Sequence, residues 1–258
     1  MTRVDHDREA TMKLRSTSAS SRVRAHAAWE TRLLLRNGEQ LLLVFLIPII
    51  LVLTLGLTSV LPGGMQQALP TVLTVSVLAA CFTSLAIATG FERRSGALRF
   101  LATTPLTRSN LLAGKALATA AVTLASMVVV IIVAGLLGWR PASSWPLGVP
   151  LVILGCLTFA GWGLLLAGTV RAEAVLAIAN GVFLILTLFG GIIIPTKAMP
   201  AALGGIVAWL PTAALAGGLR TALDTGTTWS AGQILPILIL LGWALVGALL
   251  ARRYFRWE

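Results

Sequence analysis

The sequence predicts an all-α membrane protein with six transmembrane helices, an N-terminal amphipathic interfacial helix, and re-entrant outer half-helices before the last span. Of its 258 residues, 57% are hydrophobic and 11% are charged, against roughly 25% charged in an average soluble domain, so charge is too scarce to cover a folded surface in water. The mean hydropathy is +0.91. Long uncharged runs divide the chain, without the alternation of a membrane barrel, and a segment in lipid must satisfy its own backbone hydrogen bonds, which favours helices.

Uncharged stretches of sufficient length define the spans, because a spanning helix needs roughly 20 apolar residues. The run from Gln40 to Phe91 accommodates two spans, and the sequence LPGGMQQALP supplies the turn between them. The predicted limits of the six spans are about 41–60, 68–90, 116–138, 149–170, 174–195 and 233–251.

The distribution of Lys and Arg places both termini in the cytoplasm. With that orientation the inner side holds eight of these residues before position 41, five in 92–115, Arg171 and three at the C-terminus, whereas the outer side holds three of the 20. Such an excess of positive charge is typical of cytoplasmic loops. We therefore expect a multi-pass protein of the cell (cytoplasmic) membrane, and we ascribe the net charge of +11 to this topology and not to nucleic-acid binding.

The stretch 196–220 is predicted to be a re-entrant outer segment and not a seventh span. It contains Pro200, Pro211 and two glycine pairs, each of which breaks a helix. A crossing here would also move the C-terminal sequence RRYFRWE to the outside. Two short half-helices dipping back into the outer leaflet are expected instead, packed against protein.

The remaining segments lie outside the bilayer. Residues 1–21 are predicted to form a disordered cytoplasmic tail, and 252–258 a second one. In 22–39 apolar residues alternate with charged ones at near-helical spacing, with Glu30 among the arginines, which predicts an amphipathic helix on the inner leaflet. A simple charged anchor is the alternative. The residues assigned to the interfacial helix are Arg24, Trp29, Arg32 and Arg36.

The inner loop 92–115 is predicted to hold a short helix ended by Pro105, followed by a helix capped by Thr107 that leads into the third span. Leu98 and Leu101 would share one face of the short helix, a suitable docking surface for a cytoplasmic partner. A solvated positive loop explains the pattern equally well.

The chain lacks the motifs of the common chemistries. No phosphate-binding loop exists, since Gly114-Lys115 is followed by Ala116 and has no upstream glycine. The two histidines, His6 and His26, form no metal or acid–base cluster, and the span interiors carry no ionisable residue that could couple an ion gradient. We expect neither catalysis nor a metal, and the energy for any transport would come from outside the bilayer.

The order of these parts resembles the permease subunits of type-2 ATP-binding-cassette exporters, the group that contains the daunorubicin-type drug exporters, over about residues 22–256. The sequence ERRSGALRFLATTPLTRSNLLAGK is similar to the family pattern Glu-Arg-Glu-x-Gly-Thr-Leu, Leu-x-x-Thr-Pro-Leu and Leu-x-Gly-Lys. It departs from that pattern at Arg94, where the family usually has Glu. A second match ends in Gly-x-x-x-Pro, Met-Pro, Leu-Pro and a closing Arg, and it assigns to the re-entrant outer segment Gly191, Pro195, Pro200, Pro211 and Arg220.

This resemblance implies that 92–104 is a coupling helix seated on a separate ABC ATPase (nucleotide-binding) subunit, present in two copies, and that 22–39 rests against the same subunit. A second permease chain, identical or related, would face this one across the substrate path. ATP and Mg²⁺ would bind to the partner, with no cofactor in this chain. The implied coupling residues are Glu92, Arg93, Arg94, Gly96, Leu98, Arg99, Leu101 and Pro105.

The function implied is outward movement of an amphiphilic drug, lipid or glycoconjugate by alternating access. Two other classes remain open on the residues alone: a membrane scaffold or assembly protein without a cargo path, and an ATP-independent carrier or channel. The first would tolerate substitutions along 92–104, and the second would pass solute without ATP.

Overall fold

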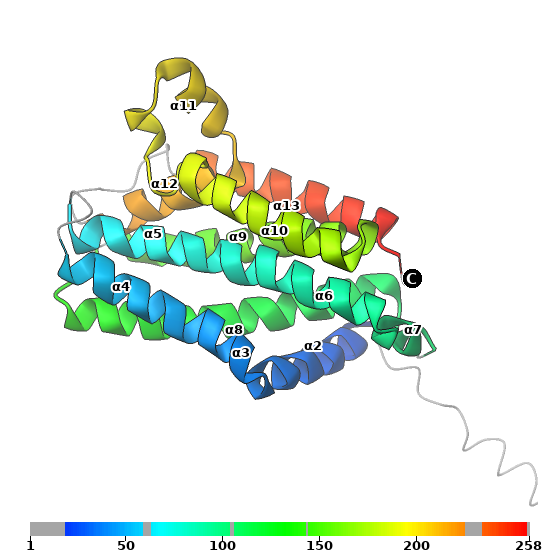
Figure 1. Ribbon diagram of the computed structural model, residues 1–258. Helices are drawn as coiled ribbons and strands as arrows, with labels where there is room; N and C mark the ends of the chain where they lie inside the picture. Colours follow the sequence, from blue (N-terminus) through cyan, green and yellow to red (C-terminus); the bar gives the residue numbers. More distant parts are fainter. Residues whose placement is uncertain (1–18, 59–62, 104–105, 143, 225–233, 257–258) are drawn as a thin grey trace, which may run out of the picture.

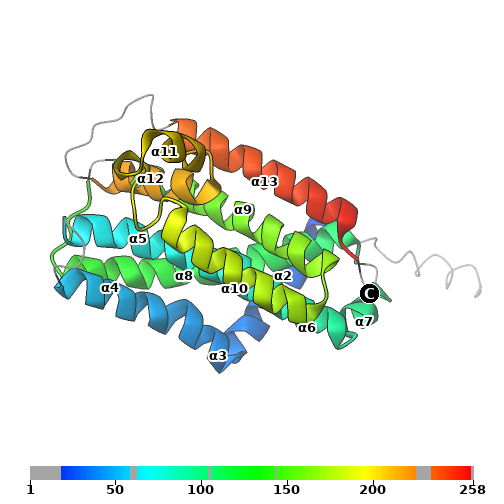
Figure 2. The same cartoon turned by 45° about the horizontal axis from the view of Figure 1, so that its top comes forward.

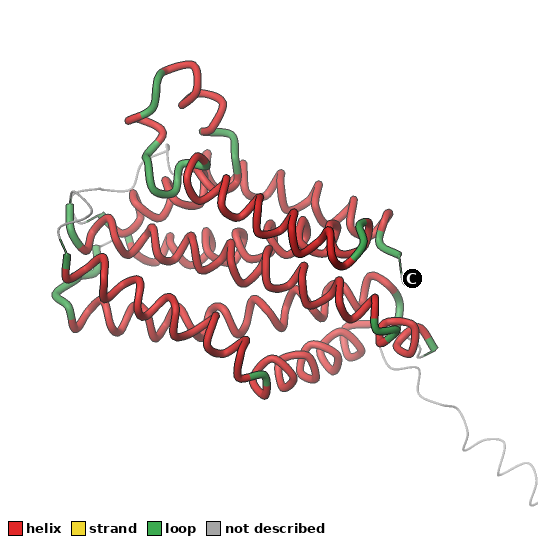
Figure 3. Tube along the Cα trace, viewed as in Figure 1, coloured by secondary structure: helices red, strands yellow, loops and turns green. Residues whose placement is uncertain are grey.

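The computed structural model describes residues 19–58, 63–103, 106–142, 144–224 and 234–256, and this part of the chain is helical with short connections and no strand (Figures 1 and 3). The predicted all-α class is therefore confirmed for these residues. Positions 1–18 of the predicted N-terminal tail and the last two residues of the chain lie outside the described residues.

Five helices among the described residues are long and apolar enough to cross a membrane. The second predicted span is one continuous helix, Met65–Arg94, made of α5 (Met65–Val77), a π-helical segment η2 (Leu78–Ser84) and α6 (Leu85–Arg94). The others are α8 (Arg108–Leu136), η3 with α9 (Trp145–Leu147 and Gly148–Thr169), α10 (Ala172–Phe189) and α13 (Ile234–Tyr254).

The first predicted span is shorter in its apolar part. The chain is helical without interruption through α3 (Gly38–Leu41), the π-helical η1 (Leu42–Leu46) and α4 (Ile47–Leu57), but only Leu42–Leu57 is apolar throughout. Counted from Gly38, this helix is about 30 Å long at 1.5 Å per residue, close to the thickness of a hydrocarbon core.

Helix α9 lies inside the bundle, packed against α13, α6, η2, α8 and α12 (Figure 2). Its glycines permit this crowding. A Cβ added at Gly161 would lie 3.1 Å from the backbone nitrogen of Ala248 in α13, and one at Gly163 would lie 2.8 Å from the carbonyl oxygen of Phe82 in η2. Small residues at such crossings allow helix backbones to approach closely in a membrane.

The predicted outer segment contains a short η4 (Thr196–Ala198), α11 (Ala201–Val207) and α12 (Pro211–Leu223), and the last two helices meet at 93°. Helix α11 projects from the side of the bundle (Figure 1). The break between the two helices follows from Pro211, which stands in the first turn of α12, where its missing N–H costs no hydrogen bond. The depth of this segment in a bilayer remains a prediction.

Two further helices lie at the end of the bundle where the described chain ends (Figure 1). Helix α2 (Ala19–Arg36) starts and stops three residues before the predicted limits 22–39, and it packs along α8. Helix α7 (Ala97–Ala102) follows α6. The Thr107 hydroxyl accepts a bond of 3.3 Å from the Asn110 amide, so α8 begins at Arg108 and takes up the last part of the predicted loop.

Candidate functional site

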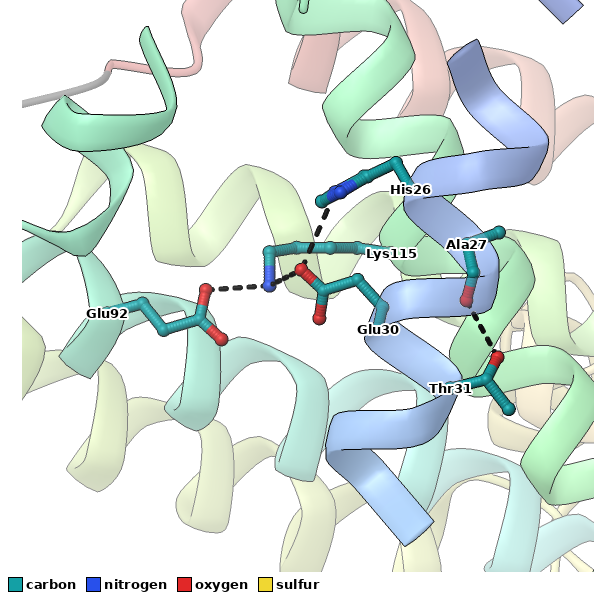
Figure 4. A network of polar contacts seen from close by, with 6 residues as sticks. All are labelled: His26, Ala27, Glu30, Thr31, Glu92 and Lys115. Carbon is teal, nitrogen blue, oxygen red and sulfur yellow. Dashed lines mark hydrogen bonds and ion pairs between the residues drawn. The ribbon is translucent and has the colours of Figure 1, made fainter. Parts of the chain in front are cut away.

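Three helices bring charged side chains together at this end of the bundle (Figure 4). The ammonium nitrogen Nζ of Lys115, on α8, lies 2.9 Å from Oε1 of Glu30 on α2 and 2.6 Å from Oε2 of Glu92 at the end of α6. The Lys115 side chain is 3% exposed. A buried charge is tolerated only when it is paired and hydrogen-bonded, and here one cation joins two helices to each other through their carboxylates.

The position of α2 follows from a glycine on α8. A Cβ added at Gly114 would lie 2.3 Å from Cδ2 of His26, so only glycine lets α2 approach this closely. His26 and Glu30 are one helical turn apart and face α8 together, with Nε2 of His26 3.5 Å from Oε1 of Glu30. Glu30, which the sequence pattern groups with the arginines of α2, is buried because Lys115 draws it into the packed face.

Burial lowers the pKa of His26. The Glu30 carboxylate opposes this effect by favouring the charged imidazolium, and the Lys115 ammonium adds to it. The structure thus favours a neutral His26 that fills the space over Gly114, while Glu30 keeps its contact with Lys115.

The segment 92–102, which we call the elbow, is where α6 turns into α7. Helix α6 ends at Arg94, and Gly96 adopts a φ of +81°, while its N–H bonds to the Arg93 carbonyl at 3.2 Å. A residue with left-handed geometry just beyond a helix is the usual glycine stop signal. The predicted coupling residue Gly96 therefore sets the angle between α6 and α7.

The predicted docking surface, which included Leu98, is wrong in its residues. Leu98 is 0% exposed and belongs to the hydrophobic core, so it anchors the elbow and cannot contact a separate protein in this conformation. The exposed apolar side chain is Phe100, at 76%, which the sequence pattern did not single out. Arg99 lies on the exposed surface. The side chain of Leu101, and Pro105 as a whole, lie outside the described residues.

The two arginines of the predicted coupling motif attach the elbow to the connection between α9 and α10. The Arg93 guanidinium donates to the Val170 carbonyl. Arg94 forms an ion pair with Glu173 in the first turn of α10, and both side chains are more than half exposed. Arg94, the residue that departs from the family pattern, thus finds its carboxylate partner within this chain.

The four residues assigned to the interfacial helix all lie on exposed parts of α2: Arg24, Trp29, Arg32 and Arg36. They do not join the Lys115 cluster. In the outer segment, Arg220 donates to the carbonyls of Gly191, at 3.0 Å, and Ile192. Gly191 has a φ of +80°. The predicted prolines begin separate elements there: Pro195 precedes η4, Pro200 precedes α11, and Pro211 opens α12.

A cavity of about 570 Å³ lies among the first helix, the η2 region, α8 and α10. Both π-helical segments line it, and such segments often occur at functional sites. Gln40 donates to the Ser84 hydroxyl at 2.6 Å, whereas the buried Thr83 hydroxyl finds no hydrogen-bond partner in the described part of the chain. The polar side chains that line it are Asn37, Gln40, Ser76, Thr83, Ser84, Thr123 and Asn180.

The apolar, membrane-length helices, with the buried ion pairs of the described residues at one end of the bundle, are the architecture of a multi-pass membrane protein. The family model for the ABC-2 type transporter matches residues 22–223, and the chain belongs to this family, as a permease subunit. It is also 25% identical over 180 residues to the "Putative transport permease YvfS" of Bacillus subtilis (strain 168), over 69% of this chain and 71% of that protein.

Proposed function

We propose that the chain is the permease subunit of an ATP-driven exporter, powered by a separate ABC ATPase subunit present in two copies and paired with a second permease chain. In this proposal ATP and Mg²⁺ bind to the ATPase, the protein lies in the cytoplasmic membrane, and the end of the bundle that carries α2, the elbow and the C-terminus faces the cytoplasm.

The observation that carries the proposal is the exposed Phe100 on a firmly held elbow. An aromatic side chain that is 76% exposed beside the fully buried Leu98 is a surface suited to a protein partner, since aromatic anchors dominate the energy of protein interfaces. The Lys115 cluster and the arginine contacts fix the base from which Phe100 projects.

The elbow is also placed to pass movement into the membrane. Helix α6 continues through η2 into α5 without a break, from Arg94 back to Met65. A displacement of the elbow by an ATPase would therefore be transmitted along one helix to the cavity, which η2 lines. Near-rigid displacement of helices is a common way to alternate access to a site.

The cavity favours an amphiphilic cargo. Its walls are mostly apolar, with Leu43, Ile47 and Leu51 on the first helix and Phe183 on α10. Hydroxyl and amide groups supply its polar part, and the lining contains no charged residue among those described. An uncharged or weakly polar head group with an apolar body, as in a drug, lipid or glycoconjugate, matches this chemistry.

The test is ATP-dependent transport in inside-out vesicles that contain the permease and any ATPase that co-purifies with it in mild detergent. Phe100→Ala should reduce ATPase binding and transport at least tenfold while insertion is unchanged. Leu136→Ala is the matched control, because Leu136 is 83% exposed at the opposite end of α8. Normal transport by Phe100→Ala would contradict the docking role, and solute flux without ATP would indicate a carrier or channel.

A further inference from the structure

We propose that Lys115 is a positioning residue that fixes α2 to the elbow, so that the two elements move as one body. The inference rests on the proposed function for its consequence in transport, but the mechanical link itself can be tested on the permease alone.

The link is ionic. Among the described residues α2 packs chiefly along α8, and its direct packing against α6 is sparse. The connection between α2 and the elbow therefore runs from Glu30 through Lys115 to Glu92, with contacts of 2.9 and 2.6 Å. Figure 4 shows the ammonium group between the two carboxylates.

Burial makes this link stiff. The side chains of Lys115 and Glu30 are 3% and 10% exposed and that of Glu92 is 34% exposed, so water is kept from the ammonium and from Glu30 and reaches only part of Glu92. If Lys115 were lost, the buried Glu30 and the partly buried Glu92 would face each other without their cation, and the desolvation of Glu30 and the mutual repulsion would drive α2 and α6 apart. Replacement of all three charged residues leaves no unpaired buried charge, so such a variant lacks the ionic link without the cost of an uncompensated carboxylate.

Two arginine contacts hold the opposite side of the elbow: the Arg93 guanidinium donates to the Val170 carbonyl, and the Arg94 ion pair is the weaker of the two. Arg94 and Glu173 are about 60% exposed, and ion pairs exposed to this degree add little stability and are screened by salt. When an ATPase displaces Phe100, the elbow is therefore expected to carry α2 with it through Lys115. Helix α2 becomes part of the moving unit, and its exposed arginines and Trp29 move relative to the membrane surface.

The experiment measures the distance between spin labels on α2 and the elbow, in purified permease without ATPase. Labels are attached through Ala28→Cys and Ala97→Cys, two small exposed positions, with the buried Cys81 and Cys156 replaced. The wild-type pair should give one narrow distance distribution. The charge-free variant Lys115→Met/Glu30→Gln/Glu92→Gln should give a distribution at least twice as broad. Lys115→Arg, which keeps the positive charge and both carboxylates, should keep the narrow one.

Arg94→Gln is the control, since it removes an ion pair of the same elbow without touching α2. It should keep the narrow distribution. A charge-free variant that folds and is as narrow as wild type would overturn the proposal, as would equal broadening by Arg94→Gln. If the single Lys115→Met variant fails to fold, the charge-free variant still tests whether the ionic link holds α2 to the elbow.

A second measurement tests the consequence for transport. With its ATPase, the charge-free variant should keep binding through Phe100 within about twofold but lose at least tenfold in cargo moved per ATP hydrolysed, and Lys115→Arg should recover most of it. If the amount of cargo moved per ATP hydrolysed is unchanged, the proposed role of the Lys115 link in transport is refuted. If wild type itself shows no ATPase partner, the proposed function fails, whereas the spin-label result still decides the link.

Discussion

Substitution of Gly114 by alanine tests the contact between α2 and α8 most directly. The new methyl carbon would lie 2.3 Å from Cδ2 of His26, at least about 1 Å short of ordinary carbon–carbon contact. Either the imidazole or the whole of α2 must retreat by that amount. Since Nζ of Lys115 is 2.9 Å from Glu30, a shift of about 1 Å takes this pair beyond hydrogen-bonding distance.

The magnitude follows from comparison with a second glycine of the same helix. Overpacking costs about 1–3 kcal/mol, whereas alanine in place of glycine favours a helix by up to about 1 kcal/mol. Gly135→Ala gains helix propensity without a clash, because nothing lies within 4 Å of its added Cβ. Gly114→Ala should therefore be less stable than Gly135→Ala by about 1–3 kcal/mol.

A thiol-reactive dye provides the assay, because Cys81 and Cys156 are both 0% exposed and react only when the bundle opens. The unfolding temperature of Gly114→Ala should fall below that of Gly135→Ala, and the double variant Gly114→Ala/His26→Ala should recover part of the loss. Equal unfolding temperatures for the two single variants would refute the close approach of α2 to α8.

Of three further predictions, the first uses the same assay, the second uses melting curves followed by circular dichroism, and the third uses hydrogen exchange. Leu98→Ala should destabilise the protein by about 2–5 kcal/mol, whereas Phe100→Ala should stay within about 0.5 kcal/mol of wild type; the reverse order would contradict the orientation of α7. The pKa of His26 is lowered from its ordinary 6.5, so its contribution to the free energy of unfolding is complete above about pH 6.5 and is lost as the pH falls further. His26→Gln should therefore flatten the dependence of stability on pH between about pH 7 and 5. Parallel profiles for the variant and the wild type would contradict this reasoning. Arg220→Met should speed hydrogen exchange in 190–195 by removing two bonds to the carbonyls after α10, whereas the exposed Lys197→Met should not.

Hydropathy predicted the fold class because a chain in lipid must satisfy its backbone hydrogen bonds internally, which helices do. Uncharged runs of membrane length form helices. Residues that start a helix act through their neighbours in the sequence and are therefore predictable: Thr107 caps α8, and Pro211 stands in the first turn of α12. The orientation in the membrane and the re-entrant course of the outer segment stay predictions.

The site was only partly predictable. Helical spacing groups residues by face but does not say which face a distant helix will cover, and α8 lies far along the chain from α2. The sequence pattern alone therefore does not separate Glu30 from the surface charges of α2, whereas its contact with Lys115 does. In the same way, Leu98 and Phe100 are both apolar residues of a short helix, and only the packing of α7 on the core separates them.

The two π-helical segments, Leu42–Leu46 and Leu78–Ser84, give the first two helices an uneven winding beside the cavity. A π turn holds one more residue than an α turn, so slippage of that extra residue along the helix rotates the side chains it passes by about 100°. Each step of such slippage would exchange one hydrogen bond between residues five apart for one between residues four apart, so the helix would not need to unwind. A shift of this kind in η2 would exchange Ser84 or Thr83 for a neighbouring apolar side chain and so change the polarity of the cavity wall.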